Sequence, residues 1–157
     1  MRKRIVDNRP ATATAESHAG WRDLTQIATV EVTSEDPRFP IESVFTNGDP
    51  GWRAGQTGEQ QIRLIFDEPV SVRRIQLRFK EPATERTQEF ILRWSAAQGG
   101  ESTEIVRQQW NFSPEGSTTE VEDYAVDLES LSVLELAIYP DTSQREAVAS
   151  LAAFLVE

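Results

Sequence analysis

The feature that most constrains the fold of this chain is a repeated alternation of apolar and polar side chains. Apolar residues recur at every second position in six segments, which are 62–66, 75–79, 90–94, 106–112, 124–128 and 134–138. In the first of them, Ile62, Leu64 and Phe66 point to one side and Arg63 points to the other. A period of two is typical of half-buried antiparallel strands, and no long amphipathic helix appears. The pattern therefore predicts an all-β fold, an antiparallel β-sandwich of the jelly-roll type.

Turn residues separate these segments. Asp67-Glu68-Pro69 lies between the first two, and Pro69 is expected to end the first strand there. An earlier strand is predicted over Ile27–Val32, followed by a loop with two prolines at 34–40 and a single helical turn over Ile41–Phe45. Residues 1–20 show no periodicity and are expected to form an irregular N-terminal arm, which leaves 21–157 as one β-sandwich domain.

Composition limits the classes of partner. The 157 residues carry a formal net charge of −10, and ten of the 26 acids follow Arg107, where Arg145 is the one base. This balance argues against nucleic acid and against an anionic membrane surface, both of which attract basic patches. The acidic last third fits a solubilising surface or, alternatively, a cationic partner.

Several kinds of chemistry have no residues to support them. There is no cysteine, so thiol nucleophiles, thiolate metal sites and disulfides are excluded. The one histidine, His18, lies in the arm without a recognisable Ser or Asp partner, and no glycine-rich phosphate loop is present. The chain is therefore predicted not to be an enzyme. No apolar run suits a signal or a membrane span, so we expect no membrane insertion and a cytoplasmic location, unless a signal has been removed.

Taken in order, these segments resemble a known family. An apolar strand and loop over 31–37, the turn and Trp-Arg of 47–53, the paired strands 61–66 and 72–79, and the strand and hairpin of 90–99 resemble the discoidin or coagulation-factor type C domains. The resemblance runs from about residue 28 to the C-terminus and implies a galactose-binding-like sandwich that binds ligands on its loop face. It also implies that 147–156 is a strand closing against the first strand, although its Ala and Leu content fits a helix by propensity.

The resemblance raises the question of calcium. Relatives that bind carbohydrate often hold Ca²⁺ beside an Asp-Gly turn, but here the turn begins with Asn47 and the segment to Trp52 lacks a hydroxyl. Asn47, Asp49 and Glu157 offer some oxygens, whereas Ca²⁺ usually takes six to eight. We therefore predict no cofactor and no metal, with a weak Ca²⁺ site at these residues as the alternative.

Three residues are predicted to contact a ligand, because the resemblance implies that their loops border the ligand face. Phe39 lies in an aromatic loop, Arg53 follows Trp52, and Arg86 lies in the 80–88 loop. An arginine fork suits a carboxylate or paired sugar hydroxyls. The alternatives are structural: Phe39 against the edge of the core, Arg53 in a salt bridge to a loop acid such as Asp36 or Asp49, and Arg86 in a structural ion pair. Trp52 is predicted to pack in the core.

Two further aromatic residues and five arginines have structural explanations that compete with binding. Trp94 and Trp110 share the parity of apolar neighbours and are predicted to be largely buried. Five arginines share the outward side of neighbouring strands and are expected to pair with acids across strands rather than to bind phosphate; they are Arg63, Arg74, Arg78, Arg93 and Arg107.

The predicted function is a binding module for carbohydrate or a similar small polar ligand. The alternative is an intracellular module that docks a protein partner through the same loops.

Overall fold

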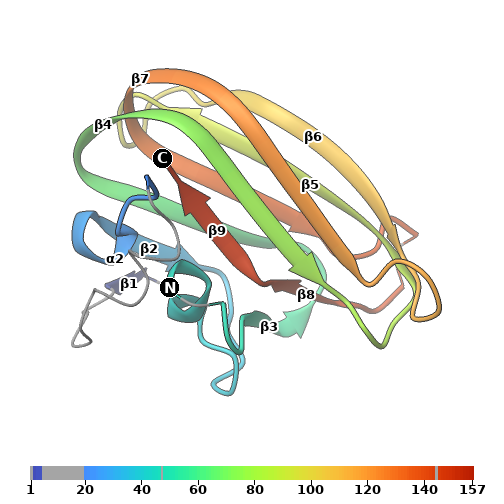
Figure 1. Cartoon of the computed structure of the whole chain (residues 1–157). Coiled ribbons are helices and arrows are strands. Elements are labelled where there is room, and N and C mark those ends of the chain that lie inside the picture. Colours follow the sequence, from blue (N-terminus) through green and yellow to red (C-terminus); the bar gives the residue numbers. More distant parts are fainter. Residues whose placement is uncertain (1, 5–19, 47, 144) are drawn as a thin grey trace.

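The computed structural model of the chain describes residues 2–4, 20–46, 48–143 and 145–157. Among them are two short helices, α2 (Leu24–Ile27) and the 3-10 helix η1 (Ile41–Phe45). The strands are β1 (Arg2–Arg4), β2 (Ala28–Val32), β3 (Trp52–Thr57), β4 (Gln60–Lys80), β5 (Arg86–Ser95), β6 (Thr103–Phe112), β7 (Thr119–Tyr139), β8 (Val148–Leu151) and β9 (Ala153–Val156). Every described pairing is antiparallel, and the strands form two facing layers (Figure 1). The predicted β-sandwich is confirmed.

The two layers are joined by β4 and β7, which pair along their whole length and arch over together at one end (Figure 1). The first half of β4 lies between β2 and the second half of β7, and β5 and β6 continue that layer. The second half of β4 lies between β9 and the first half of β7, which makes the opposite layer. Each long strand therefore contributes to both layers.

The prediction that Pro69 ends a strand is wrong. The chain stays extended from Gln60 to Lys80, and the pairing with β7 instead shifts register between Ile65 and Arg74. No ladder hydrogen bond from position 69 is needed where the register slips, so a residue without an N–H fits there. The shift also changes which residues of β4 face the core. Even-numbered residues such as Leu64 point inward before the arch, and odd-numbered residues such as Leu77 point inward after it.

The ends of the chain differ in part from expectation. Residues 2–4 of the expected irregular arm form β1, which pairs with β2, while residues 1 and 5–19, His18 included, lie outside the described residues. At the other end, 148–156 is extended, as preferred, and not helical. However, β9 pairs with β4 and β8 with β3, so the expected closure against the first strand is wrong. The helical turn expected over Ile41–Phe45 is confirmed as η1.

The core lies between the layers and is built from the alternating positions. Phe79 in one layer stacks on Phe90 in the other, with ring centres 5.2 Å apart. Trp52 is 1% exposed, which confirms its predicted core position. Trp94 and Trp110 also pack against the core, but both remain half-buried, which is less than predicted. Trp110 lies on β6, an edge strand with a neighbour on one side, so fewer atoms cover it.

Outward arginines pair with acids across strands, as expected for three of the five. Arg63 binds Glu31 and Glu135, Arg74 binds Asp123, and Arg107 binds Glu89 and Glu104, at distances of 2.6–3.2 Å. These pairs neutralise the outward surface of both layers, so the structure gives no support to a phosphate-binding patch there. Neither helix in the described ranges is long and apolar enough to cross a membrane.

Candidate binding site

Five connections of the sandwich gather at one end. The register of the strands places 33–40, 57–59, 81–85, 113–118 and the described residues of the connection after β7, 140–143 and 145–147, together, opposite the arches of β4 and β7. Rigid strands thus hold several loops within reach of one another, which is the usual way in which a sandwich positions a binding site. The candidate site lies in this loop end.

Loop 33–40 is fastened to β3 by three hydrogen bonds that involve the β3 backbone. Asp36 N donates to Arg53 O at 3.0 Å, and Arg53 N donates to Phe39 O at 3.3 Å. Gly55 N donates to Ser34 Oγ at 2.9 Å. Because these bonds occupy the outer edge of β3, the loop behaves as an added, irregular strand. The side chains of Phe39 and Arg53 are therefore fixed relative to each other by the backbone.

Two residues set how closely the loop approaches. Trp52 is buried under it and donates Nε1–H to the Ser34 carbonyl oxygen at 3.1 Å. At Gly55 the backbones nearly touch, since a Cβ atom there would lie 2.9 Å from the carbonyl oxygen of Glu35. A glycine is thus required by close approach, and Trp52 supports the site from below rather than lining it.

Between the loop and β3 lies an open pocket of ≈ 490 Å³. Its walls are residues 35–38 on one side and 53–57 with Val148 on the other. The volume lies within the usual range of small-ligand pockets. The walls combine two acids, two arginines and the side chains of Gln56 and Thr57, so the pocket is suited to a polar ligand.

Arg38 and Asp36 neutralise each other. Arg38 donates Nε to Asp36 Oδ1 at 3.2 Å and Nη2 to Oδ2 at 2.8 Å, a fork-to-carboxylate pair. The side-chain hydrogen bonds from Arg38 lower the pKa of Asp36 to about 2. Arg38 itself is 80% exposed in its side chain. Asp36 is therefore ionised at neutral pH, and its negative charge is paired with the positive charge of Arg38.

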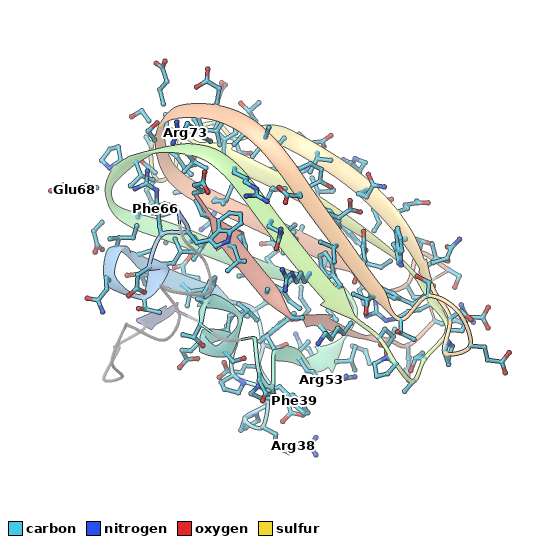
Figure 2. All side chains as sticks on the ribbon, viewed as in Figure 1. Arg38, Phe39, Arg53, Phe66, Glu68 and Arg73 are labelled. Atoms are coloured by element: carbon cyan, nitrogen blue, oxygen red, sulfur yellow. The ribbon has the colours of Figure 1, made fainter. Side chains whose placement is uncertain are left out.

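The Phe39 ring lies between two guanidinium groups. The guanidinium carbons of Arg38 and Arg53 are each 5.7 Å from the ring centre, within the range of cation–π contact. Figure 2 shows these three residues together at the bottom of the view, beside β3. The structure thus brings the predicted pair of Phe39 and Arg53 together. Arg53 lines the pocket, whereas Phe39 lies beside it as a half-buried platform.

The third predicted site residue is in a different place. Arg86 was expected on an exposed loop, but it begins β5 and is 1% exposed, so that placement is wrong. It binds Glu81 at 2.9 Å, and its guanidinium carbon lies 4.8 Å from the centre of the Phe112 ring. The ion pair that was the competing explanation is therefore the observed one, and Arg86 does not line the pocket.

The weak Ca²⁺ alternative involves three positions that the structure treats differently. Asn47 lies outside the described residues, and Asp49 is exposed. Glu157 turns toward Gly20, because a Cβ atom on Gly20 would lie 2.6 Å from Glu157 Oε2. Within the described part of the chain, no group of three His, Asp or Glu side chains is arranged to hold a metal ion. The absence of a metal stays a prediction.

Sequence reasoning missed two parts of the site. The Asp36–Arg38 pair was not predicted, although two opposite charges two residues apart in a Pro-bounded loop are a recognisable signal. The contact at Gly55 was also missed, and nothing in the sequence alone marks which backbone approaches that glycine.

Comparison with solved structures identifies proteins of similar architecture. The module CpGH89CBM32-5 from Clostridium perfringens, in complex with GalNAc-β-1,3-galactose, matches with a TM-score of 0.65 and 13% identity over 87% of this chain and 99% of that one. The family 32 carbohydrate-binding module of AlyQ, in complex with 4,5-unsaturated mannuronic acid, matches with a TM-score of 0.61 and 16% identity over 83% and 95%. A Ruminococcus gnavus fucosidase, in complex with fucose, matches with a TM-score of 0.63 and 9% identity over 92% of this chain and 28% of the enzyme.

No family model matches the sequence, and no curated protein matches it. The TM-scores of 0.61–0.65 establish a common fold, and the identities of 9–16% leave the ligand open. The chain therefore has the galactose-binding-like β-sandwich of the family 32 carbohydrate-binding modules, which was the architecture implied by the sequence resemblance.

Proposed function

We propose that this chain is a non-catalytic carbohydrate-binding module and that its ligand lies in the pocket between loop 33–40 and β3. The observation that carries the proposal is Arg53, whose half-buried guanidinium lines the pocket, lies against an aromatic ring and makes no hydrogen bond or ion pair with any other described residue. A planar donor fork held in position is suited to sugar oxygens.

The chemistry of the walls agrees with this proposal. Sugar recognition needs convergent donors and acceptors on rigid backbone, and Arg53, Gln56 and Thr57 of β3 supply them. Phe39 stiffens the arginine rather than offering an open stacking face. Two structural neighbours are complexes with sugars, a GalNAc-galactose disaccharide and an unsaturated mannuronic acid, which supports a carbohydrate ligand here by analogy of fold.

The test is a glycan array probed with the wild-type chain and two variants, with and without Ca²⁺. Arg53→Gln removes the pocket guanidinium. Arg73→Gln is the matched control, because Arg73 is exposed at the arch of β4, away from the site (Figure 2). We expect the wild type and Arg73→Gln to bind a common set of glycans, and Arg53→Gln to lose them.

Two results would overturn the proposal. One is a wild-type chain that binds no glycan, together with a protein partner recovered by pull-down, which would favour docking of a protein through the same loops. The other is glycan binding that Arg53→Gln leaves unchanged, which would place the ligand elsewhere on the sandwich.

A further inference from the structure

Among the described residues, Arg53 shares the lack of a carboxylate partner with Arg22, Arg73, Arg78 and Arg93, but of these arginines it is the one that lines the pocket. Six others bind a carboxylate at 2.6–3.2 Å, and they are Arg38, Arg63, Arg74, Arg86, Arg107 and Arg145. No carboxylate among the described residues lies within ion-pairing distance of Arg53. Its charge has no ion-pair partner among the described residues, although the chain contains 26 acidic residues. The guanidinium of Arg53 therefore lines the pocket without a direct ion pair.

The acids nearest to Arg53 are committed to other partners. Both Asp36 oxygens accept hydrogen bonds from the Arg38 fork, at 3.2 and 2.8 Å. Glu35 Oε1 accepts the backbone N–H of Ile41 at 2.8 Å. Moving either carboxylate to Arg53 would break a bond that shapes the loop. Neither acid forms an ion pair with the Arg53 guanidinium, although the charge of Arg53 contributes to the lowered pKa of Asp36.

Arg53 is also held ready for a ligand before binding. The carbonyl oxygen of Arg53 accepts a hydrogen bond from Asp36 N at 3.0 Å, and its backbone N–H donates to Phe39 O at 3.3 Å. On the other edge of β3, its register partner in β8 is Ser150. The Phe39 ring limits the directions that the guanidinium can take. A half-buried, positioned charge gains more from a counter-ion than a free surface charge does, because less entropy is lost and the surroundings are less polar.

From this geometry we infer that the sugar bound at the pocket carries a carboxylate, and that Arg53 receives that carboxylate with its two-pronged fork. The inference rests on the proposed function and names the ligand class for the same site. A carboxylate matches the planar guanidinium with two parallel, charge-assisted hydrogen bonds, which neutral hydroxyls cannot equal in strength. Gln56 and Thr57 are then left to contact the hydroxyls of the ring.

The net charge of the whole chain does not exclude an anionic ligand. The four charged residues of the pocket wall, Glu35, Asp36, Arg38 and Arg53, sum to zero, and exposed charges farther away are screened within about 8–10 Å at physiological ionic strength. The charges close to the pocket are therefore balanced, and the acidic last third of the sequence does not impose a negative field there.

The experiment compares sugars that differ in the carboxylate alone, by isothermal titration. Three matched pairs are used: trigalacturonate, a glucuronate oligomer and sialyllactose, each compared with its own methyl ester. We expect the wild type to bind at least one acid about tenfold or more tightly than its neutral partner. Arg53→Gln should lose that preference, Arg53→Lys should keep part of it because the charge remains without the fork, and Arg73→Gln should behave as wild type.

The two proposals fail in different ways. If the neutral sugars bind as tightly as the acids, or if Arg53→Gln keeps a preference for the acid, the ligand class is wrong while carbohydrate binding stands. If none of the acids binds while neutral glycans on the array do, the same conclusion holds. If neither the acids nor any array glycan binds, the proposed function itself is wrong.

Discussion

Arg86 donates its Nε–H to Glu81 Oε1 at 2.9 Å, with both side chains enclosed by the sandwich. The same guanidinium donates through Nη1 to the carbonyl oxygen of Pro140 at 2.9 Å and through Nη2 to Ser150 Oγ at 3.4 Å. One arginine thus connects the ends of β4, β5, β7 and β8 directly below the loop end. We interpret it as the structural clamp that holds the binding loops in position.

Removing this clamp is expected to unfold rather than to block binding specifically. In Arg86→Ala the Glu81 carboxylate would stay buried without its partner, which costs about 3–5 kcal/mol. The measurement is the free energy of unfolding in urea. The double variant Arg86→Met with Glu81→Gln is the control, and it should recover part of the loss because no charge is left buried. A stable Arg86→Ala that has lost glycan binding would contradict the interpretation.

The contact at Gly55 predicts a variant that alters the site from a distance. In Gly55→Ala the new methyl group would press on the Glu35 carbonyl oxygen, at 2.9 Å before relaxation. Loop 33–40 should move away from β3, and glycan affinity should fall by about tenfold or more, since a small displacement of positioned groups is costly. The titration is repeated with Gly116→Ala, where φ is not positive and a Cβ atom meets nothing nearer than 3.9 Å. Equal effects of the two variants would argue against close packing at Gly55.

Trp52 and Trp110 should differ in their contribution to stability. Trp52 is 1% exposed, so Trp52→Ala should cost about 3–5 kcal/mol through the cavity that it leaves. Trp110 is half-buried on an edge strand and donates Nε1–H to Ser117 Oγ at 3.0 Å, so Trp110→Ala should cost less. Urea unfolding of both variants decides the order. A larger loss for Trp110→Ala would mean that the edge strand carries more of the core than its burial indicates.

Glu120 is a fully buried acid on the inward face of β7, opposite Phe79. Its Oε1 accepts a hydrogen bond from Gln88 Nε2 at 3.1 Å. Burial, and then the neighbouring Glu122 carboxyl, raise the pKa of Glu120 to about 9, although Arg86 opposes the shift. The folded chain therefore keeps this acid protonated at neutral pH.

The raised pKa predicts a loss of stability on the alkaline side. An unfolded glutamate releases its proton near pH 4.5, whereas folded Glu120 keeps it to about pH 9. The folded state binds more protons between these values, so the free energy of unfolding should be highest below pH 4.5, as far as this group is concerned, and should fall as pH rises toward 9.

Urea titrations at several pH values measure this slope. Glu120→Gln should flatten it because the amide does not titrate, while Glu115→Gln, at an exposed position, should leave it unchanged. An identical slope in Glu120→Gln and wild type would show that Glu120 is ionised in the folded chain at neutral pH.

The strands could be predicted from sequence because alternation reports directly on burial. Each of the six alternating segments lies within a described strand, since the inward face has to be apolar along its length. The continuity of β4 through Pro69 could not be predicted in this way. Alternation reports on which face is buried, and it says nothing about whether two segments on either side of an arch are one strand.

The site was predicted in part, for a related reason. Phe39 and Arg53 were placed together because the implied fold brings their loop and strand to one end. Arg86 was misplaced because a charged residue beside a Pro-containing loop has the same local pattern whether it is exposed or paired in the core. The deciding partner is Glu81, and only the three-dimensional structure shows that its carboxylate and Arg86 are enclosed together.

The measurement that tests the central claim most directly is a heteronuclear NMR titration of the wild-type chain with the strongest glycan from the array. If the pocket beside Arg53 is the binding site, the amide signals of 35–39 and 53–57 should shift together and saturate. The signals of the distant arch, 67–73, should stay unchanged. Shifts that cluster at the arch or on the outward faces, with those of 53–57 unmoved, would contradict the assignment of the site.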